Sequence, residues 1–355
     1  MIGKMIYLWK GRHCAGGDLG KTVAECKRLG LRAVALKIAD AVYERYASYP
    51  DDMEGAVKAF KAAGMKVWGW QYIYGGIVMN RSGQVLSTNG ARPEAEAECA
   101  LYECRRLGLD GYIIDAEQEY KVMAQAERAK RFMARLAALE VPVALSSYRF
   151  PSLHPEFPWG EFLRGCDLHM PQVYWGRGRA ESDLDRSMQE LKAIRALPIT
   201  PVGRAYTGDG HAGFAASGTD LIPDEIRSFM RRAQDTGCPG VSFWSLDHLY
   251  LHSGGPGRAD AITEFTWVLP EEGSPQGEAE QPGPGSSGYP IVEIIAVNYL
   301  NVRDAPEGRD LGDLKAGLRF YVFEERQSGG YTWGRIGEKA WVALGKGRAE
   351  FRSQE

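Results

Sequence analysis

The strongest constraint on the fold is a regular alternation of short apolar runs with longer amphipathic stretches over residues 1–269. Eight runs have the length and composition of buried strands. These runs are Met5–Trp9, Ala33–Ile38, Lys66–Tyr72, Gly111–Ile114, Val143–Ser147, Leu168–Tyr174, Ile199–Ala205 and Val241–Trp244. The helical patterns are Leu19–Leu29, Met53–Ala63, Glu94–Leu107, Val122–Leu139, Leu184–Arg195, Glu225–Thr236 and Ala261–Val268.

Strict alternation of strands and helices implies right-handed crossovers and a parallel sheet. Eight such units fit a (β/α)₈ barrel, also called a TIM barrel, whose usual size is ~250 residues. An open, doubly wound sheet is the alternative, but no GxGxxG or GxxxxGK[ST] motif follows an early strand. We therefore expect an α/β fold and favour the barrel over the open sheet.

Residues 270–288 read PEEGSPQGEAEQPGPGSSG and contain almost no large apolar side chain. Such a segment cannot bury a core, so it is predicted to be a flexible linker. It separates a domain at 1–269 from a second domain at 289–355. The second domain has short β-rich runs at Ile291–Val297, Leu318–Glu324, Tyr331–Ile336 and Trp341–Leu344, with turn-forming glycines and prolines between them. This pattern predicts a small all-β barrel.

The second domain also carries a recognisable series of motifs. Leu300-Asn-Val-Arg303 is followed by Pro306 and Gly308, then by Trp333-Gly-Arg-Ile336 and Ala340-Trp-Val-Ala343. This series resembles the bacterial SH3-type (SH3b) module over nearly the whole domain. Members of that family commonly bind cell-wall peptidoglycan or peptides, so the resemblance implies a wall glycan or wall peptide as partner. We expect four residues to be core: Leu300, Val302, Trp333 and Trp341.

Composition argues against several other partners. The chain has 43 basic and 46 acidic residues, a formal charge of −3, so no overall positive field exists to hold a nucleic acid. No apolar run approaches the ~18 residues that cross a bilayer, and the start lacks a secretory signal pattern, so we expect no membrane partner. The histidines are scattered, without HExxH or a spaced Cys/His set, so we expect no metal and no cofactor.

The fourth apolar run ends in two closely spaced acids. In Asp110-Gly-Tyr-Ile-Ile-Asp115-Ala-Glu117 the last two carboxylates are two residues apart. Strand geometry places them on the same side, ~6.6 Å apart along the chain, at the end of the barrel where chemistry occurs. Two acids in a partly dry cleft cannot both ionise freely, so one has a raised pKa and can act as a general acid near neutral pH. Glycosidic bond cleavage needs such an acid.

The segment D-G-x-x-x-D-x-E resembles the fourth-strand signature of the family-18 glycoside hydrolases, the chitinases and their relatives. That resemblance implies that Glu117 is the proton donor and that Asp115 orients an acetamido group of the substrate. Met170-Pro-Gln-Val-Tyr-Trp175 and Gly240-Val-Ser-Phe-Trp244 are similar to segments of the sixth and eighth strands in that family, where a Trp commonly forms the floor of the sugar site. The D-x-E pair also resembles the family-25 lysozyme-type muramidases, which cut the same kind of N-acetylated polymer.

The sequence departs from both families. Ile113 occupies a position where family-18 enzymes usually carry an Asp, and the first strand, Ile6–Lys10, lacks the Asp of a family-25 enzyme. Two functions are therefore open: a glycosidase, or a catalytically inactive glycan- or wall-binding protein on the same fold. A third possibility, an intracellular glycosidase with an incidental β-domain, is favoured only if residues 289–355 bind no wall material. In the enzyme, Asp115 either positions a substrate N-acetyl group that attacks its own anomeric carbon, or acts itself as base or nucleophile.

Other side chains at strand ends are candidates for sugar binding. Gln172 and Tyr174 alternate on the sixth strand and offer an amide and a hydroxyl group, and Trp244 offers an apolar face for a pyranose ring. Further candidates are Gln71, Tyr72, Tyr148, Tyr206 and Asp247. We expect Glu119 to be solvated in the loop beyond Glu117, and Asp247 and His248 to be exposed neighbours.

The sequence thus predicts a lysozyme- or endolysin-like hydrolase of an N-acetylated cell-wall glycan, peptidoglycan foremost. A weak binding domain on a flexible tether raises the effective concentration of the catalytic domain at an insoluble polymer. Such a substrate implies a site of action at the cell wall or outside the cell, although no signal peptide is visible.

Overall fold

The computed structural model describes residues 3–80, 82–206, 221–249, 255–268, 291–294, 300–314, 319–322, 324–337, 340–345 and 348–352. The predicted linker at 270–288 lies outside the described residues. Two compact units, Met1–Leu269 and Pro270–Glu355, divide the chain.

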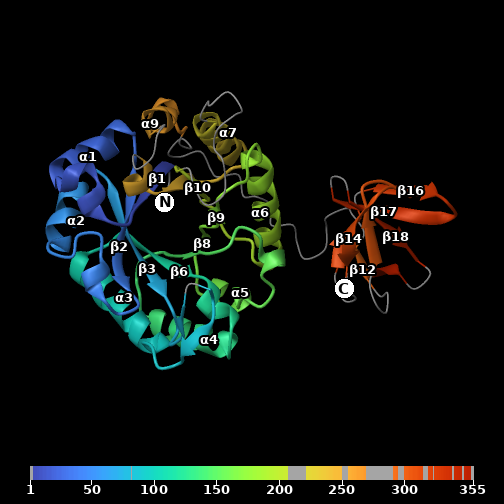
Figure 1. Cartoon of the computed structure of the whole chain (residues 1–355), viewed down its shortest axis with the longest axis horizontal. Coiled ribbons are helices and arrows are strands. Elements are labelled where there is room, and N and C mark those ends of the chain that lie inside the picture. Colours follow the sequence, from blue (N-terminus) through green and yellow to red (C-terminus); the bar gives the residue numbers. More distant parts are fainter. Residues whose placement is uncertain are drawn as a thin grey trace. The chain divides into compact units, whose positions relative to one another are not determined.

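The first unit is a curled parallel sheet surrounded by helices (Figure 1). Its strands are β1 (Gly3–Leu8), β2 (Ala33–Asp40), β3 (Lys66–Ile73), β6 (Gly111–Ala116), β7 (Val143–Ser146), β8 (Leu168–His169), β9 (Gln172–Val173), β10 (Val202–Arg204) and β11 (Gly240–Trp244). Every predicted run contains a strand, and the sixth contains two, β8 and β9.

The strand order is β8-β7-β6-β3-β2-β1-β11-β10-β9. The first strand thus lies beside the last, which fits an α/β barrel and not a doubly wound sheet. The hydrogen-bonded path is not a closed ring, because it ends at β8 and β9, two pieces of one segment. Pro171, which has no backbone N–H to donate, lies between these pieces. Isolated parallel bridges, Tyr148 to Gln172 and His169 to Ile199, flank the interruption.

Helices cover the outside of the sheet in Figure 1. They are α1 (Leu19–Arg28), α2 (Met53–Ala62), α3 (Pro93–Leu107), α4 (Gln125–Leu136), α5 (Trp159–Leu163), α6 (Ala180–Ile194), α7 (Ile222–Asp235), α8 (Leu246–Leu249) and α9 (Gly255–Glu264). Two N-caps follow from sequence, since Asp18 accepts from Lys21 N at 2.9 Å and Asp52 from Gly55 N at 2.8 Å. Within the described ranges, no helix has the length and apolarity needed to span a bilayer.

Short elements occupy several of the connections. They are the 3₁₀ turns η1 (Gly11–His13), η2 (Ala15–Gly17), η3 (Glu44–Tyr46), η4 (Gln118–Lys121) and η5 (Pro151–Leu153), and the strands β4 (Val78–Met79) and β5 (Val85–Ser87). The turns η1, η3 and η4 follow β1, β2 and β6, so they lie at the carboxyl ends of these strands.

The core has two layers, which follow from strand alternation. One layer lies between the sheet and the helices, and the other fills the inside of the curled sheet. On β3, Trp68 and Trp70 face inward while Val67 packs in the outer layer. Gly111 at the start of β6 leaves room for one of these rings, since a Cβ there would lie 2.4 Å from Trp68. Ile113 lies in the same inner layer, so the alternation carries inward to Asp115.

The second unit is an antiparallel β structure. Its strands are β12 (Ile291–Ile294), β13 (Leu300–Arg303), β14 (Asp310–Leu314), β15 (Arg319–Tyr321), β16 (Glu324–Ser328), β17 (Tyr331–Gly337), β18 (Ala340–Leu344) and β19 (Ala349–Arg352). All pairings are antiparallel except β18 with β19. Leu300, Trp333 and Trp341 are buried, and Val302 packs against the core in a half-buried position. The antiparallel sheet is therefore present as expected, while its SH3 identity stays a prediction.

Candidate active site

Three carboxylates follow one another at the carboxyl end of β6. Asp115 is buried within the strand, Glu117 is half-buried directly before η4, and Glu119 lies in η4. Ile113, one step earlier on the same face, is completely buried in the inner core. Because the row continues a buried strand, its acids stand at the open end of a dry interior rather than on a solvated loop. We call Asp115, Glu117 and Glu119 the acid row.

One side chain from the sixth strand joins two of these acids. Gln172 Nε2 donates to Asp115 Oδ1 at 3.0 Å and to Glu117 Oε1 at 3.0 Å. Because both bonds start at one nitrogen atom, the two acceptor oxygens lie no more than about 6 Å apart, twice the 3.0 Å of each bond. Gln172 therefore holds the predicted catalytic pair at a fixed separation.

Burial changes the protonation of the acid row. It raises the pKa of Asp115 well above the usual range, and the charge of Glu117 adds to this effect while Lys37 opposes it. Burial also raises the pKa of Glu117, the Gln172 hydrogen bond lowers it, and the charge of Glu119 raises it further. The row therefore favours protonated carboxyl groups, which is the state a general acid needs near neutral pH.

The expectation that Glu119 is solvated is wrong. Glu119 is only 4% exposed, and its carboxylate accepts a hydrogen bond from Tyr72 Oη at 2.7 Å. Burial is also the main cause of its raised pKa. The 3₁₀ turn η4 returns the chain toward β3, so the third carboxylate stays in the site.

A second polar group lies beside the acid row and was not expected from sequence. Lys37 on β2 is buried and pairs with Asp40, which also accepts from Tyr74 Oη at 2.6 Å. The rings of Tyr72 and Tyr74 are 4.9 Å apart, which connects this group to Glu119. A lysine inside the apolar run Ala33–Ile38 was the sequence signal for it, because a cation in such a run needs a partner.

Aromatic side chains pack together inside the carboxyl end of the sheet, with Tyr7 and Trp70 buried beneath the others. Trp244, on β11, is half-buried and lies 5.4 Å from Trp70, 5.6 Å from Tyr7 and 6.1 Å from Trp9, measured between ring centroids. These rings come from β1, β3, β11 and the residue after β1. The predicted apolar face at Trp244 is therefore part of a continuous aromatic floor.

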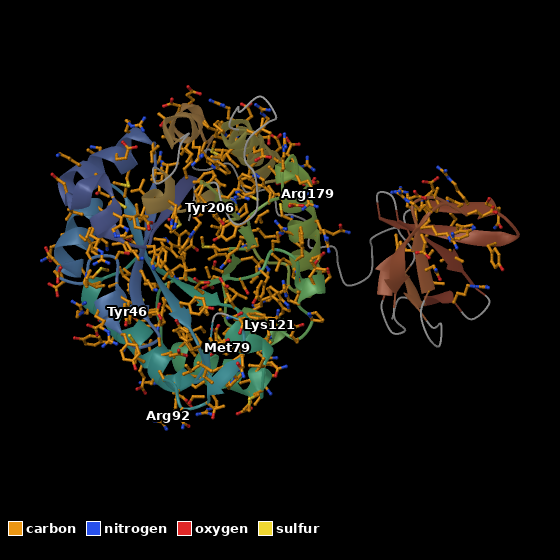
Figure 2. The ribbon with its side chains drawn as sticks, in the orientation of Figure 1. Tyr46, Met79, Arg92, Lys121, Arg179 and Tyr206 are labelled. Atoms are coloured by element: carbon orange, nitrogen blue, oxygen red, sulfur yellow. The ribbon has the colours of Figure 1, made fainter. Side chains whose placement is uncertain are left out.

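The predicted tyrosines lie on the sixth-strand side of the site. Tyr174 and Tyr206 are half-buried, with ring centroids 6.0 Å apart in an edge-on arrangement. Tyr148 stacks on His154 at 3.8 Å, and Lys121 Nζ lies 5.0 Å from its ring centroid. Figure 2 shows Tyr206 and Lys121 at separate points around the strand ends. Burial and the nearby Glu117 charge raise the pKa of Tyr148, which keeps its hydroxyl protonated.

Asp247 and His248, which follow β11, were expected to be exposed. Instead, Asp247 is buried and His248 is half-buried. Asp247 is 3% exposed and accepts from Ser245 Oγ at 2.7 Å and from Trp9 N at 3.2 Å. His248 Nδ1 lies 2.7 Å from the same hydroxyl, and its ring stacks on Trp9 at 5.7 Å. Asp247 thus connects the end of β1, through Trp9 N, to the end of β11, through Ser245.

Gln71 lies on the opposite side of the sheet from the acids. Its amide donates to the carbonyl groups of Ala41 and Glu96, and its oxygen accepts from Tyr112 Oη at 2.7 Å. Alternation explains the difference, because Trp70 and Tyr72 on either side of it face inward. The expectation that Gln71 lines the mouth is therefore corrected: the residue stabilises the sheet–helix layer.

Within the described part of the chain, no group of three His, Cys, Asp or Glu side chains could hold a metal ion. Of the histidines, His169 is buried with Nε2 2.8 Å from the Arg195 carbonyl oxygen, while His211 and His252 lie outside the described residues.

Comparisons with known proteins place the fold. No protein-family model and no curated protein matches the sequence. Among solved structures, active domain 2 of a thermostable chitinase from Pyrococcus furiosus has a TM-score of 0.52 at 13% identity, covering 76% of this chain and 98% of that one. The spore cortex-lytic enzyme SleL of Bacillus cereus scores 0.51 at 11% identity, covering 75% and 74%.

A class V chitinase from the plant Cycas revoluta is similar in structure to the same degree. Its TM-score is 0.51 at 12% identity, covering 74% of this chain and 99% of that one. The likeness is one of fold. At these identities it shows that the first unit shares the α/β-barrel fold of these structures. A shared fold does not fix a function, which depends on the residues of the site itself.

Proposed function

We propose that the first unit is a glycoside hydrolase that cleaves an N-acetylated cell-wall glycan of the peptidoglycan type, with Glu117 as general acid and Asp115 as its partner. One observation carries the proposal: a single amide, Gln172 Nε2, holds both carboxyl groups at 3.0 Å in a buried setting that raises the pKa of each. The structurally similar proteins named as chitinases and as a spore cortex-lytic enzyme support a glycan substrate.

The proposed reaction begins with proton transfer. Glu117 gives its proton to the glycosidic oxygen while the bond from that oxygen to the anomeric carbon breaks, and the leaving sugar departs as an alcohol. The anomeric carbon is attacked either by the acetamido oxygen of the substrate, positioned by Asp115, or by the Asp115 carboxylate. Water, deprotonated by Glu117, then completes hydrolysis and returns both groups to their starting state.

The separation of the acids favours a retaining outcome. Oxygens no more than about 6 Å apart are closer than the ~6.5–9.5 Å of inverting glycosidases, which need room for a water between the two carboxyl groups, and they are compatible with the ~5–5.5 Å of retaining ones. We propose Trp244 as the sugar-stacking floor, with Tyr174, Tyr148 and Tyr206 as hydroxyl groups around it.

The second unit is proposed to hold the enzyme on the wall, as an SH3b-like module. It contains a hollow of about 350 Å³ whose lining includes Tyr331, Trp333, Arg303, Glu307 and Arg348. Trp333 is buried on its core side, so the charged groups at the rim are the ones available for ligand specificity.

A second candidate function is wall binding without catalysis. Ile113 favours it, because this fully buried apolar side chain stands where a family-18 enzyme would usually carry an acid next to the acid pair. Lys37 and Asp40 supply polar groups near Asp115 from another strand, which favours the enzyme.

Release of reducing ends separates these functions. The full chain and its Glu117→Gln variant are incubated with purified peptidoglycan and with chitin oligomers, and binding to the wall polymer is followed by sedimentation. The enzyme predicts release by the wild type that falls about 10²–10⁴-fold in the variant while sedimentation is kept. Sedimentation of both proteins with no release by either would establish the binding protein instead.

A further inference from the structure

A second hollow lies at the same end of the strands as the acid row. It has a volume of about 430 Å³, which suits one sugar ring with its substituents. Its walls come from the segment after β1, from the end of β2, and from the turn η3 with the residues that follow it. The lining of this hollow includes Trp9, Lys10, Arg12, Lys37, Asp40, Arg45 and Tyr46. We call this hollow the basic pocket; Tyr46 at its wall is labelled in Figure 2.

The charge of the basic pocket is strongly one-sided. Four of its lining side chains are cations, and Asp40 is its one carboxylate, already engaged by Lys37 and by Tyr74. Lys10, Arg12 and Arg45 make no ion pair with a carboxylate in the described part of the chain. The protein as a whole has a formal charge of −3, so this concentration of unneutralised cations is local.

Aromatic rings, rather than carboxylates, hold two of these cations. Lys10 Nζ lies 4.0 Å from the ring centroid of Trp9. The Arg45 guanidinium lies 4.7 Å from the Tyr43 ring and 4.9 Å from the Tyr46 ring. Such contacts orient a cation without neutralising it, so the charge remains available for an anion. By contrast, arginines on the outer helices pair with acids, as Arg131 does with Glu94.

The basic pocket adjoins the acid row along a continuous set of contacts. Trp9 at its wall faces Trp244 of the aromatic floor with ring centroids 6.1 Å apart. Asp40 at its base accepts from Tyr74, whose ring packs on Tyr72, the residue that donates to Glu119. A sugar on the aromatic floor would therefore have its neighbour, or a substituent, at the basic pocket.

We propose that the basic pocket binds a carboxylate carried by the glycan, next to the bond that is cut. This inference rests on the proposed glycosidase and narrows its substrate to an acidic glycan. Guanidinium groups bind carboxylates through paired hydrogen bonds, and the apolar face of a sugar fits against Trp9 and Tyr46. The carboxylate can belong to a lactyl ether or attached peptide, as in peptidoglycan, or to a uronic acid.

The test compares carboxylate and amide forms of one substrate. The full chain is assayed on soluble peptidoglycan glycan-strand fragments and on the same fragments with the carboxyl groups amidated, and the ratio of the two KM values is the readout. For the wild type we expect a KM at least about tenfold lower on the carboxylate form. Arg12→Gln with Arg45→Gln should bring that ratio close to one. Arg131→Gln with Arg135→Gln on α4, which also removes two positive charges, should leave it unchanged.

Competition experiments identify the source of the carboxylate, and the KM ratios decide whether the basic pocket binds it. Oligomers of a uronic acid that compete equally well would assign a general carboxylate site, and weak competition would assign the lactyl or peptide carboxylate. A wild-type ratio of one, or a ratio unaffected by the double variant, would overturn the proposal; so would stronger competition by inorganic phosphate than by acetate, which would indicate a phosphate ligand.

Failure of the proposed catalysis can be recognised separately. If no fragment is turned over, the same carboxylate and amide fragments are titrated against the full chain by calorimetry. Preferential binding of the carboxylate form that disappears in the double variant would support the basic pocket without the enzyme. Equal binding of both forms would reject the basic pocket whatever the catalytic result.

Discussion

The acid row and the basic pocket lie side by side but are built in opposite ways. The acid row follows one strand, and burial together with a shared hydrogen bond raises the pKa of its carboxyl groups. The basic pocket is assembled from the end of β2 and the connections after β1 and β2, and its arginines are exposed to solvent. The comparison teaches that burial can set the protonation needed for chemistry, while exposed loop charges can select the substrate without disturbing that chemistry.

The largest expected effect comes from breaking the acid row itself. Asp115→Asn removes the carboxyl group proposed to position the substrate acetamido group or to attack the anomeric carbon, so kcat should fall about a hundredfold or more. The measurement is reducing-end release from peptidoglycan at saturating substrate, with the melting temperature recorded to confirm folding.

Asp110→Asn is the matched control for that experiment. Asp110 belongs to the same D-G-x-x-x-D-x-E segment but lies at the opposite end of β6, where it accepts from Val67 N at 2.9 Å and pairs with Lys66 at 3.0 Å. Its loss should cost about 1 kcal/mol of stability and leave kcat essentially unchanged. Equal loss of kcat in both variants would show that the segment serves the fold and not the reaction.

A smaller effect should appear in the dependence of kcat/KM on pH. Replacing two neighbours of Glu117, Glu119 and Gln172, should shift its alkaline limb in opposite directions. A general acid works while protonated, so activity is lost as pH rises through its pKa. The charge of Glu119 raises the pKa of Glu117, so Glu119→Gln should move the alkaline limb of kcat/KM to lower pH. The Gln172 hydrogen bond lowers that pKa, so Gln172→Leu should move the limb to higher pH.

Each shift of the alkaline limb is expected to be about half to one pH unit. Opposite directions in the two variants would identify Glu117 as the group that controls this limb. Glu98→Gln, on the outer face of α3 where Glu98 pairs with Arg135, is the control and should leave the limb in place. Shifts in the same direction for both variants would mean that another group controls the alkaline limb.

The sequence predicted much of the acid row because strand alternation is local information. Eight apolar runs were enough to place Asp115 and Glu117 at a strand end and Gln172 on another, and the structure brings the three together. Glu119 was misjudged because the 3₁₀ turn η4, not a loop, follows the strand. Gln71 was misjudged because the end of an apolar run does not by itself tell which face a residue occupies.

The basic pocket could not be predicted in the same way. Lys37 and Asp40 are three residues apart and would face opposite sides of a regular strand, but the pairing of β2 with β3 shifts register between Lys37 and Ala39. Arg12 and Arg45 belong to turns after different strands, and only the parallel pairing of β1 with β2 makes these turns neighbours. Tertiary structure, not periodicity, creates the charge cluster.

The smallest expected effect is a response to salt. It distinguishes the acid row from the basic pocket most clearly, because salt should affect the two regions differently. The Debye length falls from ~10 Å at 0.1 M to ~3 Å at 1 M salt, so exposed charges are screened and buried ones hardly at all. Raising salt over about this range should increase KM several-fold on carboxylate-bearing fragments and leave KM on the amidated fragments nearly constant. The kcat should stay constant on both, since the acid row is buried. A parallel loss of kcat would mean that the exposed arginines help to set the protonation of Glu117, and the two regions would then have to be treated as one electrostatic unit.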